Sequence, residues 1–308
     1  MGLGGWGPEA WIRRLGIAKV PIAPAAFFRA AAAQYLNWID RPPTATLDIA
    51  DYRYEARRSA SGVPVRIYTT ARTPASELAA FRRSPAMIDF FETLVGRYPF
   101  DAFGNVVAQD PELYYSLETQ TMVNYREDAR IGEITVAHEL AHQWFGDAVT
   151  AAEWRDLWLA EGFATYFELL WPNRDDPAGF DAAMRDLYAH VVRDKVGPAV
   201  VSRPEDIFAD NTYDRGALTL YALRLKVGDA AFYRTLRTYY RTYRYRNATS
   251  ADFIRVAVRE GHQPGVQKLL HAWLYEQPVP PLPGAGTAAA PEGASVPTTA
   301  HGYSVKRR

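Results

Sequence analysis

The sequence predicts an α+β fold in which a small sheet precedes a mainly helical lobe. Alternating stretches between residues 44 and 70 flank the turn-rich cluster 59–62, a pattern typical of a β-hairpin. Short strands are expected at 106–108 and 121–125. From there to about residue 276, most of the chain has apolar residues at helical spacing. Strands therefore come first and helices after.

Composition limits the classes of function. The 308 residues are 48% hydrophobic and 23% charged, which is enough for a sizeable core in one or two globular domains. The formal net charge is zero, so no overall field favours nucleic acid or a membrane surface as a partner. Because the chain has no cysteine, thiolate zinc ligands, disulfides and a cysteine nucleophile are excluded. A metal site here must use His, Asp or Glu.

The N-terminal residues 1–43 are expected to form an irregular segment, because they mix Gly, Pro and Ala without a sustained amphipathic period. Lys19, Pro21 and Pro24 interrupt the most apolar stretch, 15–33, so no membrane span is predicted. The same residues break the apolar region that a signal peptide needs. We therefore expect a cytoplasmic protein, with export as the alternative.

A helical segment follows the hairpin. Apolar residues recur at helical spacing over 76–98, and Pro85 is expected to kink or split this helix. The last segment is rich in Gly, Ala, Pro, Ser and Thr and cannot bury enough apolar area to fold. We expect a hairpin over 44–72, a main domain over 73–282 and a disordered tail over 283–308.

The motif HELAHQWFGD at residues 138–147 lies in a run with helical apolar spacing, 131–145. His138 and His142 are four residues apart, so their imidazoles lie on one helix face and can converge on a single cation. Glu139 is placed to take a proton from a water molecule on that metal. The short pattern alone also occurs by chance, where the histidines are ordinary surface or core residues.

A catalytic zinc site takes three protein ligands and keeps a fourth position open. Glu161 is the candidate third ligand, because it lies in a second helical run after a spacing of 18 residues from His142. Thr165 and Glu168 on the same run are candidates for hydrogen bonds to the ligands. The alternative is an interior threonine and a solvated glutamate, and the sequence leaves both open.

The HExxH motif followed 18 residues later by glutamate resembles the signature of the gluzincin peptidases, and within them the aminopeptidase N family. The resemblance implies a thermolysin-like catalytic domain, with a small mixed sheet packed on a mainly helical lobe. It also implies one Zn²⁺ per chain held by His138, His142 and Glu161, with Glu139 as general base. Peptides with a free N-terminus are the implied substrates.

Flanking residues 143–146 and 154–166 are also similar to that family, except that Ala160 stands where asparagine is common. Only residues 44–72 resemble part of the family's N-terminal β domain, as a remnant of its last hairpin. We therefore expect a chain truncated at the N-terminus, with a missing domain or a partner covering an exposed face.

Two further site residues rest on the resemblance. Residues 211–216 read NTYDRG before a predicted helix over 217–227 and resemble a family element whose tyrosine stabilises the oxyanion, which implies this role for Tyr213. The chain has 19 tyrosines, and the alternative for any of them is simple packing.

Residues 115–120, YSLETQ, keep only the glutamate of the family's G-x-M-E-N strand, which implies that Glu118 binds the substrate amine. A charged residue on an exposed edge strand is the alternative.

The leading hypothesis is a zinc-dependent aminopeptidase that hydrolyses the N-terminal peptide bond through a metal-activated water. One alternative is a remnant that binds zinc and peptides without turnover. Another is a zinc endopeptidase, because the amine-anchoring motif is degenerate. The remaining histidines have no ligand spacing and are expected to be polar surface or tail residues: His190, His262, His271 and His301.

Overall fold

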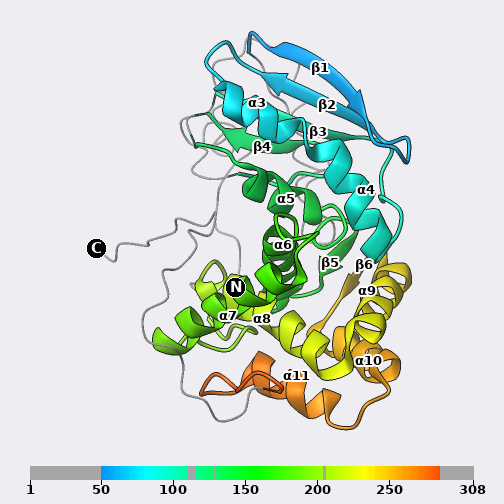
Figure 1. Ribbon diagram of the computed structural model, residues 1–308, viewed down its shortest axis with the longest axis vertical. Helices are drawn as coiled ribbons and strands as arrows, with labels where there is room; N and C mark the ends of the chain where they lie inside the picture. The colour runs from blue at the N-terminus through cyan, green and yellow to red at the C-terminus, as the bar shows by residue number, and fades with distance from the viewer. Residues whose placement is uncertain (1–49, 110–115, 128, 204–205, 285–308) are drawn as a thin grey trace, which may run out of the picture.

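The computed structural model describes residues 50–109, 116–127, 129–203 and 206–284. The expected irregular segment 1–43 and nearly all of the expected tail lie outside the described residues. Figure 1 shows a sheet at one end of the molecule and a group of helices at the other, with α5 and α6 between them. This is the predicted α+β arrangement.

Four strands form a mixed sheet in the order β1-β2-β3-β4. They are β1 (Arg53–Arg58), β2 (Pro64–Thr69), β3 (Phe103–Ala108) and β4 (Val123–Arg126). β1 and β2 pair in antiparallel fashion, which confirms the predicted hairpin. Gly62 in its turn has a φ of 99°, a conformation that favours glycine. β3 and β4 are then added in parallel.

The hairpin is continuous with the rest of the sheet. β2 pairs with β3, so that Val65 stands opposite Phe103, and both side chains are buried. The expected boundary between residues 72 and 73 therefore falls within a segment that joins two neighbouring strands of one sheet. The sheet, including the hairpin, supports the helices that follow.

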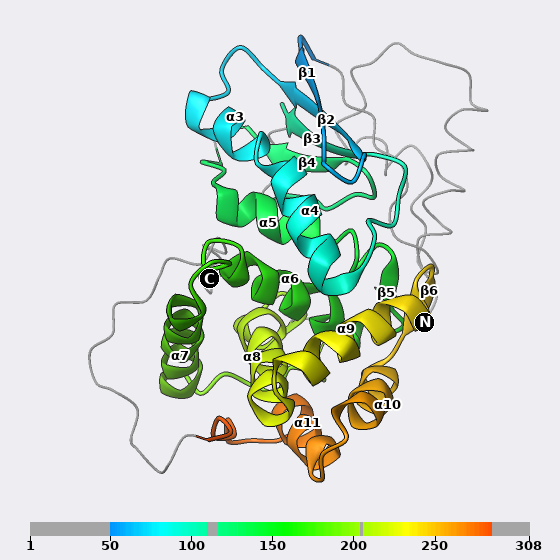
Figure 2. The ribbon, with the colours of Figure 1, turned by 45° about the vertical axis from the view of Figure 1, so that its right-hand side comes forward.

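Helices α3 (Ala75–Phe81) and α4 (Ser84–Val95) replace the single run expected over 76–98, so the predicted split is confirmed. Pro85 lies in the first turn of α4, where its missing N–H removes no helical hydrogen bond. The ring of Phe81 packs 4.9 Å from that of Tyr125 on β4. Figure 2 shows both helices beside the sheet, with α4 extending toward α5 and α9.

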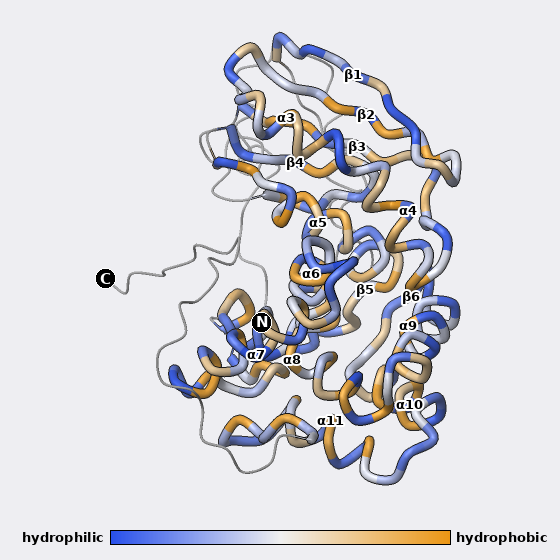
Figure 3. The backbone as a smooth tube through the Cα atoms, viewed as in Figure 1, coloured by the Kyte–Doolittle hydropathy of each residue, from blue (hydrophilic) through white to orange (hydrophobic). Residues whose placement is uncertain are grey.

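The helical lobe contains most of the chain. Its helices are α5 (Glu133–Ala141), α6 (Trp158–Leu170), α7 (Pro177–Arg193), α8 (Asp210–Val227), α9 (Asp229–Tyr243), α10 (Ser250–Gly261) and α11 (Val266–Tyr275), with a 3₁₀ turn at Trp154–Asp156. All 13 residues of α6 are buried, so this helix is the centre of the lobe. Hydrophilic and hydrophobic residues alternate along the outer helices α9 and α10 (Figure 3), as expected of amphipathic helices.

Two short strands were not predicted. β5 (Val149–Ala151) and β6 (Arg246–Ala248) pair in parallel and connect the loop after α5 to the segment between α9 and α10. Each has only three residues, too few to show an alternating pattern. Among the residues that the structure describes, no helix combines the length and apolar character needed to cross a membrane.

Candidate metal centre

The first two candidate ligands lie at the end of α5. His138 is inside the helix, and His142 is the residue that caps it, with helical backbone angles of φ −57° and ψ −27°. The helix is shorter than the predicted run to Phe145, because a turn replaces its last residues. Gly146 follows with a φ of 138°, a conformation that favours glycine. His142 nevertheless stays one turn beyond His138, as the spacing predicts.

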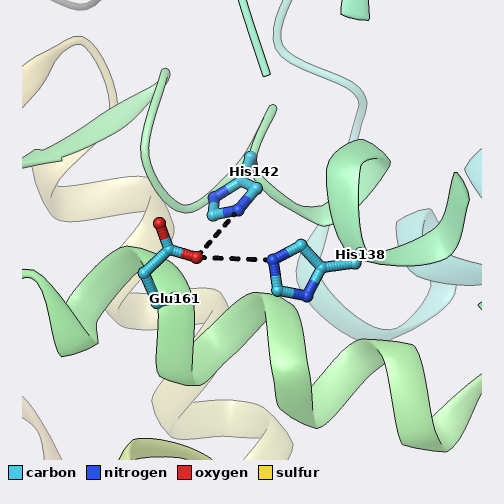
Figure 4. Close-up of side chains that lie close together, drawn as sticks. All are labelled: His138, His142 and Glu161. Atoms are coloured by element: carbon cyan, nitrogen blue, oxygen red, sulfur yellow. Dashed lines mark hydrogen bonds and ion pairs between the residues drawn. The ribbon is translucent and has the colours of Figure 1, made fainter. Parts of the chain in front are cut away.

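Glu161 of α6 meets both histidines. Its Oε2 atom lies 3.3 Å from Nε2 of His138 and 3.3 Å from Nε2 of His142 (Figure 4). One donor atom from each of the three residues lies within 4.8 Å of the others, and all three side chains are buried. Donors around a tetrahedral zinc with bonds of about 2.0–2.1 Å lie about 3.3–3.4 Å apart. The spacing therefore fits a shared zinc ion.

The outer nitrogen of each imidazole has its own acceptor. Nδ1 of His138 lies 2.9 Å from Oε2 of Glu168, and Nδ1 of His142 lies 3.2 Å from the carbonyl oxygen of Phe145. A proton on Nδ1 that is donated to these acceptors leaves the Nε2 lone pairs free to face Glu161. The structure thus places Glu168 inside the protein, fully buried, rather than in solvent. Its signal in the sequence is the spacing of seven residues from Glu161, two turns along one helix face.

Electrostatics at this point favour positive charge. Burial acts to lower the pKa of His138, but hydrogen bonds with Glu161 and Glu168 outweigh it and raise the pKa to about 10. Burial opposes the same change at His142, where the charge of Glu161 raises the pKa to about 9. Burial acts to raise the pKa of Glu161, yet the two histidines hold it well below its usual range. The carboxylates that stabilise the protonated histidines here would also stabilise a metal cation that replaces those protons.

Glu139 follows His138 on α5 and is 7% exposed. Burial raises its pKa to about 8, an effect that the charges of His138 and His142 partly oppose. A carboxyl group with this pKa can accept and release a proton near neutral pH. This is the property that the expected general base requires.

Glu118 is half-buried beside the same site. Its negative charge raises the pKa values of both Glu139 and His142, so it lies close to them. Its neighbour Leu117 forms an isolated antiparallel bridge to Asn124 of β4. Two backbone hydrogen bonds of this bridge hold Leu117, the neighbour of Glu118, against β4.

Tyr213 approaches from α8. Its ring lies 6.2 Å from the ring of His138 at an interplanar angle of 19°, and its side chain is 8% exposed. The expected helix start at residue 217 is wrong, because α8 begins at Asp210 and includes the tyrosine. Residues 210–216 are polar or small, so the apolar pattern becomes clear only after the first two turns. The structure thus brings all six expected site residues to one region.

The fold and the geometry of the site are those expected of a metallopeptidase catalytic domain. The sequence profile of the Peptidase family M1 domain matches residues 97–273, more than half of the chain. The chain belongs to peptidase family M1.

Relatives of known name agree with this assignment. Aminopeptidase M1-B from Oryza sativa subsp. japonica is 30% identical over 243 residues, covering 71% of this chain and 28% of that protein. Human endoplasmic reticulum aminopeptidase 2 is 28% identical over 228 residues, which are 66% of this chain and 24% of the relative. The chain therefore spans about a quarter of the length of such relatives.

Solved structures show the same fold. A crystal structure of an M1 zinc metallopeptidase from Deinococcus radiodurans is 34% identical, with a TM-score of 0.68, and covers 80% of this chain and 54% of its own. A mutant M1 zinc metallopeptidase from that organism, bound to a Tyr-Ser-Ala substrate, is also 34% identical, with a TM-score of 0.67 and coverage of 76% and 53%. The chain spans about half the length of these proteins.

Proposed function

We propose that this chain is a zinc-dependent aminopeptidase that hydrolyses the N-terminal peptide bond of peptides. The observation that carries the proposal is the convergence of His138, His142 and Glu161 at the spacing of zinc ligands, beside the buried Glu139. Relatives named aminopeptidases and solved M1 zinc metallopeptidases support the same activity.

One Zn²⁺ per chain would be held by the two imidazoles and the carboxylate of this centre. Two nitrogen donors and one oxygen donor are a typical ligand set of catalytic zinc, and they leave a coordination position for water or substrate. When bound, zinc lowers the pKa of water and polarises the substrate carbonyl. The protein's own part is to hold the ligands rigidly, through Glu168 and the carbonyl of Phe145.

Glu139 would accept the proton of the attacking water and pass it to the leaving amine. Its buried position and raised pKa support this role in proton transfer. The hydroxyl of Tyr213 would donate a hydrogen bond to the oxyanion, a contribution typically worth about 2.7–4 kcal/mol of barrier. The position of its ring beside His138 supports this assignment.

Glu118 would select the end of the peptide. A carboxylate beside the site can accept a charge-assisted hydrogen bond from the α-ammonium group, which an internal peptide bond does not possess. The effect of its charge on the pKa values of Glu139 and His142 supports this assignment. We therefore favour the aminopeptidase over the endopeptidase.

The test is hydrolysis of matched fluorogenic peptides that differ only in a free or an N-acetylated amino group. We expect cleavage of the free peptide alone, loss of activity with a zinc chelator, and recovery when zinc is restored. Equal cleavage of the acetylated peptide would favour an endopeptidase. Stoichiometric zinc without cleavage of either peptide would favour a binding remnant.

A further inference from the structure

A second group of potential metal ligands lies where α7 meets the start of α8. Nε2 of His190 on α7 lies 3.7 Å from Oδ2 of Asp210 and 3.5 Å from Oδ2 of Asp214, both on α8. One donor atom of each residue lies within 4.8 Å of the others. The two helices lie side by side in both ribbon views (Figures 1 and 2). His190 was expected to be a polar surface residue, because it has no ligand spacing in the sequence.

Asp214 is the unusual member of this group. It is 6% exposed, and no residue that the structure describes donates a hydrogen bond to its carboxylate. The contact with His190, at 3.5 Å, is too long to be a good hydrogen bond. A buried carboxylate without donors is costly unless a proton or a cation neutralises it.

Neighbouring charges increase this cost. Asp210 and Asp214 are one turn apart on the same face of α8, where like charges repel. Burial raises the pKa of Asp214 to about 8, and the charges of Asp210 and Glu168 add to the effect. A cation shared by the two aspartates would remove the repulsion between them.

The imidazole of His190 can be oriented for such a cation. Its Nδ1 atom lies 3.2 Å from Oδ2 of Asp194, an acceptor that can hold the ring while Nε2 faces the aspartates. Arg193 also contacts Nδ1, at 2.9 Å, but its guanidinium is exposed and already pairs with Asp194 at 2.9 Å. It can therefore turn aside when Nδ1 carries a proton.

We propose that His190, Asp210 and Asp214 form a second binding site for a divalent transition-metal cation such as Zn²⁺, separate from the centre on α5 and α6. One imidazole and two carboxylates suit this class of ion. The separations of 3.5 and 3.7 Å are close to the roughly 3.3–3.4 Å between tetrahedral zinc ligands. Because the Asp210 side chain is 57% exposed, an ion can reach the site from solvent.

The site would connect α7 to the part of α8 that carries Tyr213. This tyrosine lies between the two aspartates in the sequence, and Asp214 is close enough to Glu168 to feel its charge. A bound cation would therefore fix the first turns of α8 against α7. The second site would therefore have a structural role, because it would stabilise the part of α8 that lies beside the candidate metal centre.

Zinc content after equilibrium dialysis against Zn²⁺ tests the proposal without any measurement of activity. We expect two zinc ions per chain in the wild type, and one in each of the single variants His190→Gln and Asp214→Asn. His138→Gln should also hold a single zinc, now at the second site. The matched control is His271→Gln, which removes an exposed histidine paired with Glu276 at 2.9 Å and should leave both ions.

A second readout guards against variants that bind less zinc because they fold poorly. In the His138→Gln background, added Zn²⁺ should still raise the melting temperature, and this rise should disappear when His190→Gln is added. Circular dichroism of the metal-free variants must match that of the wild type. A single zinc in the wild type, or a second zinc that survives in both His190→Gln and Asp214→Asn, would overturn the proposal. Failure of the aminopeptidase assay alone would leave these zinc counts unchanged.

Discussion

Gly162 of α6 and Gly216 of α8 meet backbone to backbone. A Cβ atom on Gly162 would lie 2.7 Å from Cα of Gly216, and one on Gly216 would lie 2.8 Å from Cα of Gly162. Only two glycines permit helices to approach this closely. Because Glu161 directly precedes one glycine and Tyr213 lies three residues before the other, this contact holds the segments that carry the candidate ligand and the candidate oxyanion donor close together.

Gly216→Ala should lower both stability and turnover. Alanine normally stabilises a helix interior by about 0.8–1.0 kcal/mol relative to glycine. Here the new Cβ meets rigid backbone, and such overpacking typically costs about 1–3 kcal/mol. We expect a lower free energy of unfolding by urea denaturation and a lower kcat, because Tyr213 is displaced. Gly197→Ala is the control, since a Cβ there meets nothing within 4 Å. A more stable, fully active Gly216→Ala would contradict the account.

Glu168→Gln should weaken zinc binding without removing a ligand. The carboxylate that accepts from Nδ1 of His138 is lost, and outer partners of this kind typically contribute about 10–100-fold in metal affinity. Competition with a chromogenic chelator measures the change. Glu276→Gln removes a similar partner from the exposed His271 and should have no effect. Equal affinities in all three proteins would show that Glu168 does not position the ligand.

The stability of the metal-free protein should fall as pH rises. The pKa values of His138 and His142 are raised from 6.5 to about 10 and about 9, so the folded state holds their protons more tightly than the unfolded state. The resulting stabilisation is fully present below pH 6.5 and is lost as pH rises through about 9 to 10. A zinc ion held by the two histidines would take the place of these protons.

The melting-temperature difference between zinc-loaded and metal-free protein should therefore widen between pH 6.5 and about 9. Differential scanning fluorimetry across this range measures it. His271→Gln should follow the wild type, whereas metal-free His142→Gln should lose stability less steeply. A difference that stays constant or narrows would argue against protonated histidines in the metal-free site.

Glu118→Gln should reduce the preference for a free amine. A hydrogen bond to a charged group is worth about 1.5–3 kcal/mol, which corresponds to about 10–100-fold in kcat/KM for the free peptide. The acetylated peptide should remain uncleaved. Glu153→Gln, at an exposed glutamate paired with Arg155, should behave like the wild type. An unchanged kcat/KM for the free peptide would assign amine recognition to another residue.

Much of the fold was predictable because its signals are local. The hairpin, the split at Pro85 and the order of strands before helices follow from turn residues, proline and apolar spacing. The pairing of β5 with β6 joins segments almost 100 residues apart and leaves no periodic signal in either. The early start of α8 was missed because its first two turns are mostly polar residues, which are buried by tertiary contacts from Asn211 onward.

The residues of the candidate site likewise divide into those with a local signal in the sequence and those that depend on long-range packing. His138, His142 and Glu161 could be proposed because their spacing along the chain reflects helix geometry. The environment of Glu168 could not, since its burial depends on how α5 and α6 pack. His190 faces Asp214 only because α7 folds back along α8, and no spacing in the sequence records that contact.

Zinc content and hydrolysis of a free-amine peptide, measured together on the wild type, Glu139→Gln and His142→Gln, test the central claim most directly. To isolate the candidate centre, all three are measured in the His190→Gln background, and the wild type in this comparison is that single variant. We predict that Glu139→Gln retains one zinc but loses about 10²–10⁴-fold in kcat, the usual contribution of a general base. His142→Gln should lose both zinc and activity. Substantial turnover by Glu139→Gln, or wild-type activity that does not depend on zinc, would contradict the assignment.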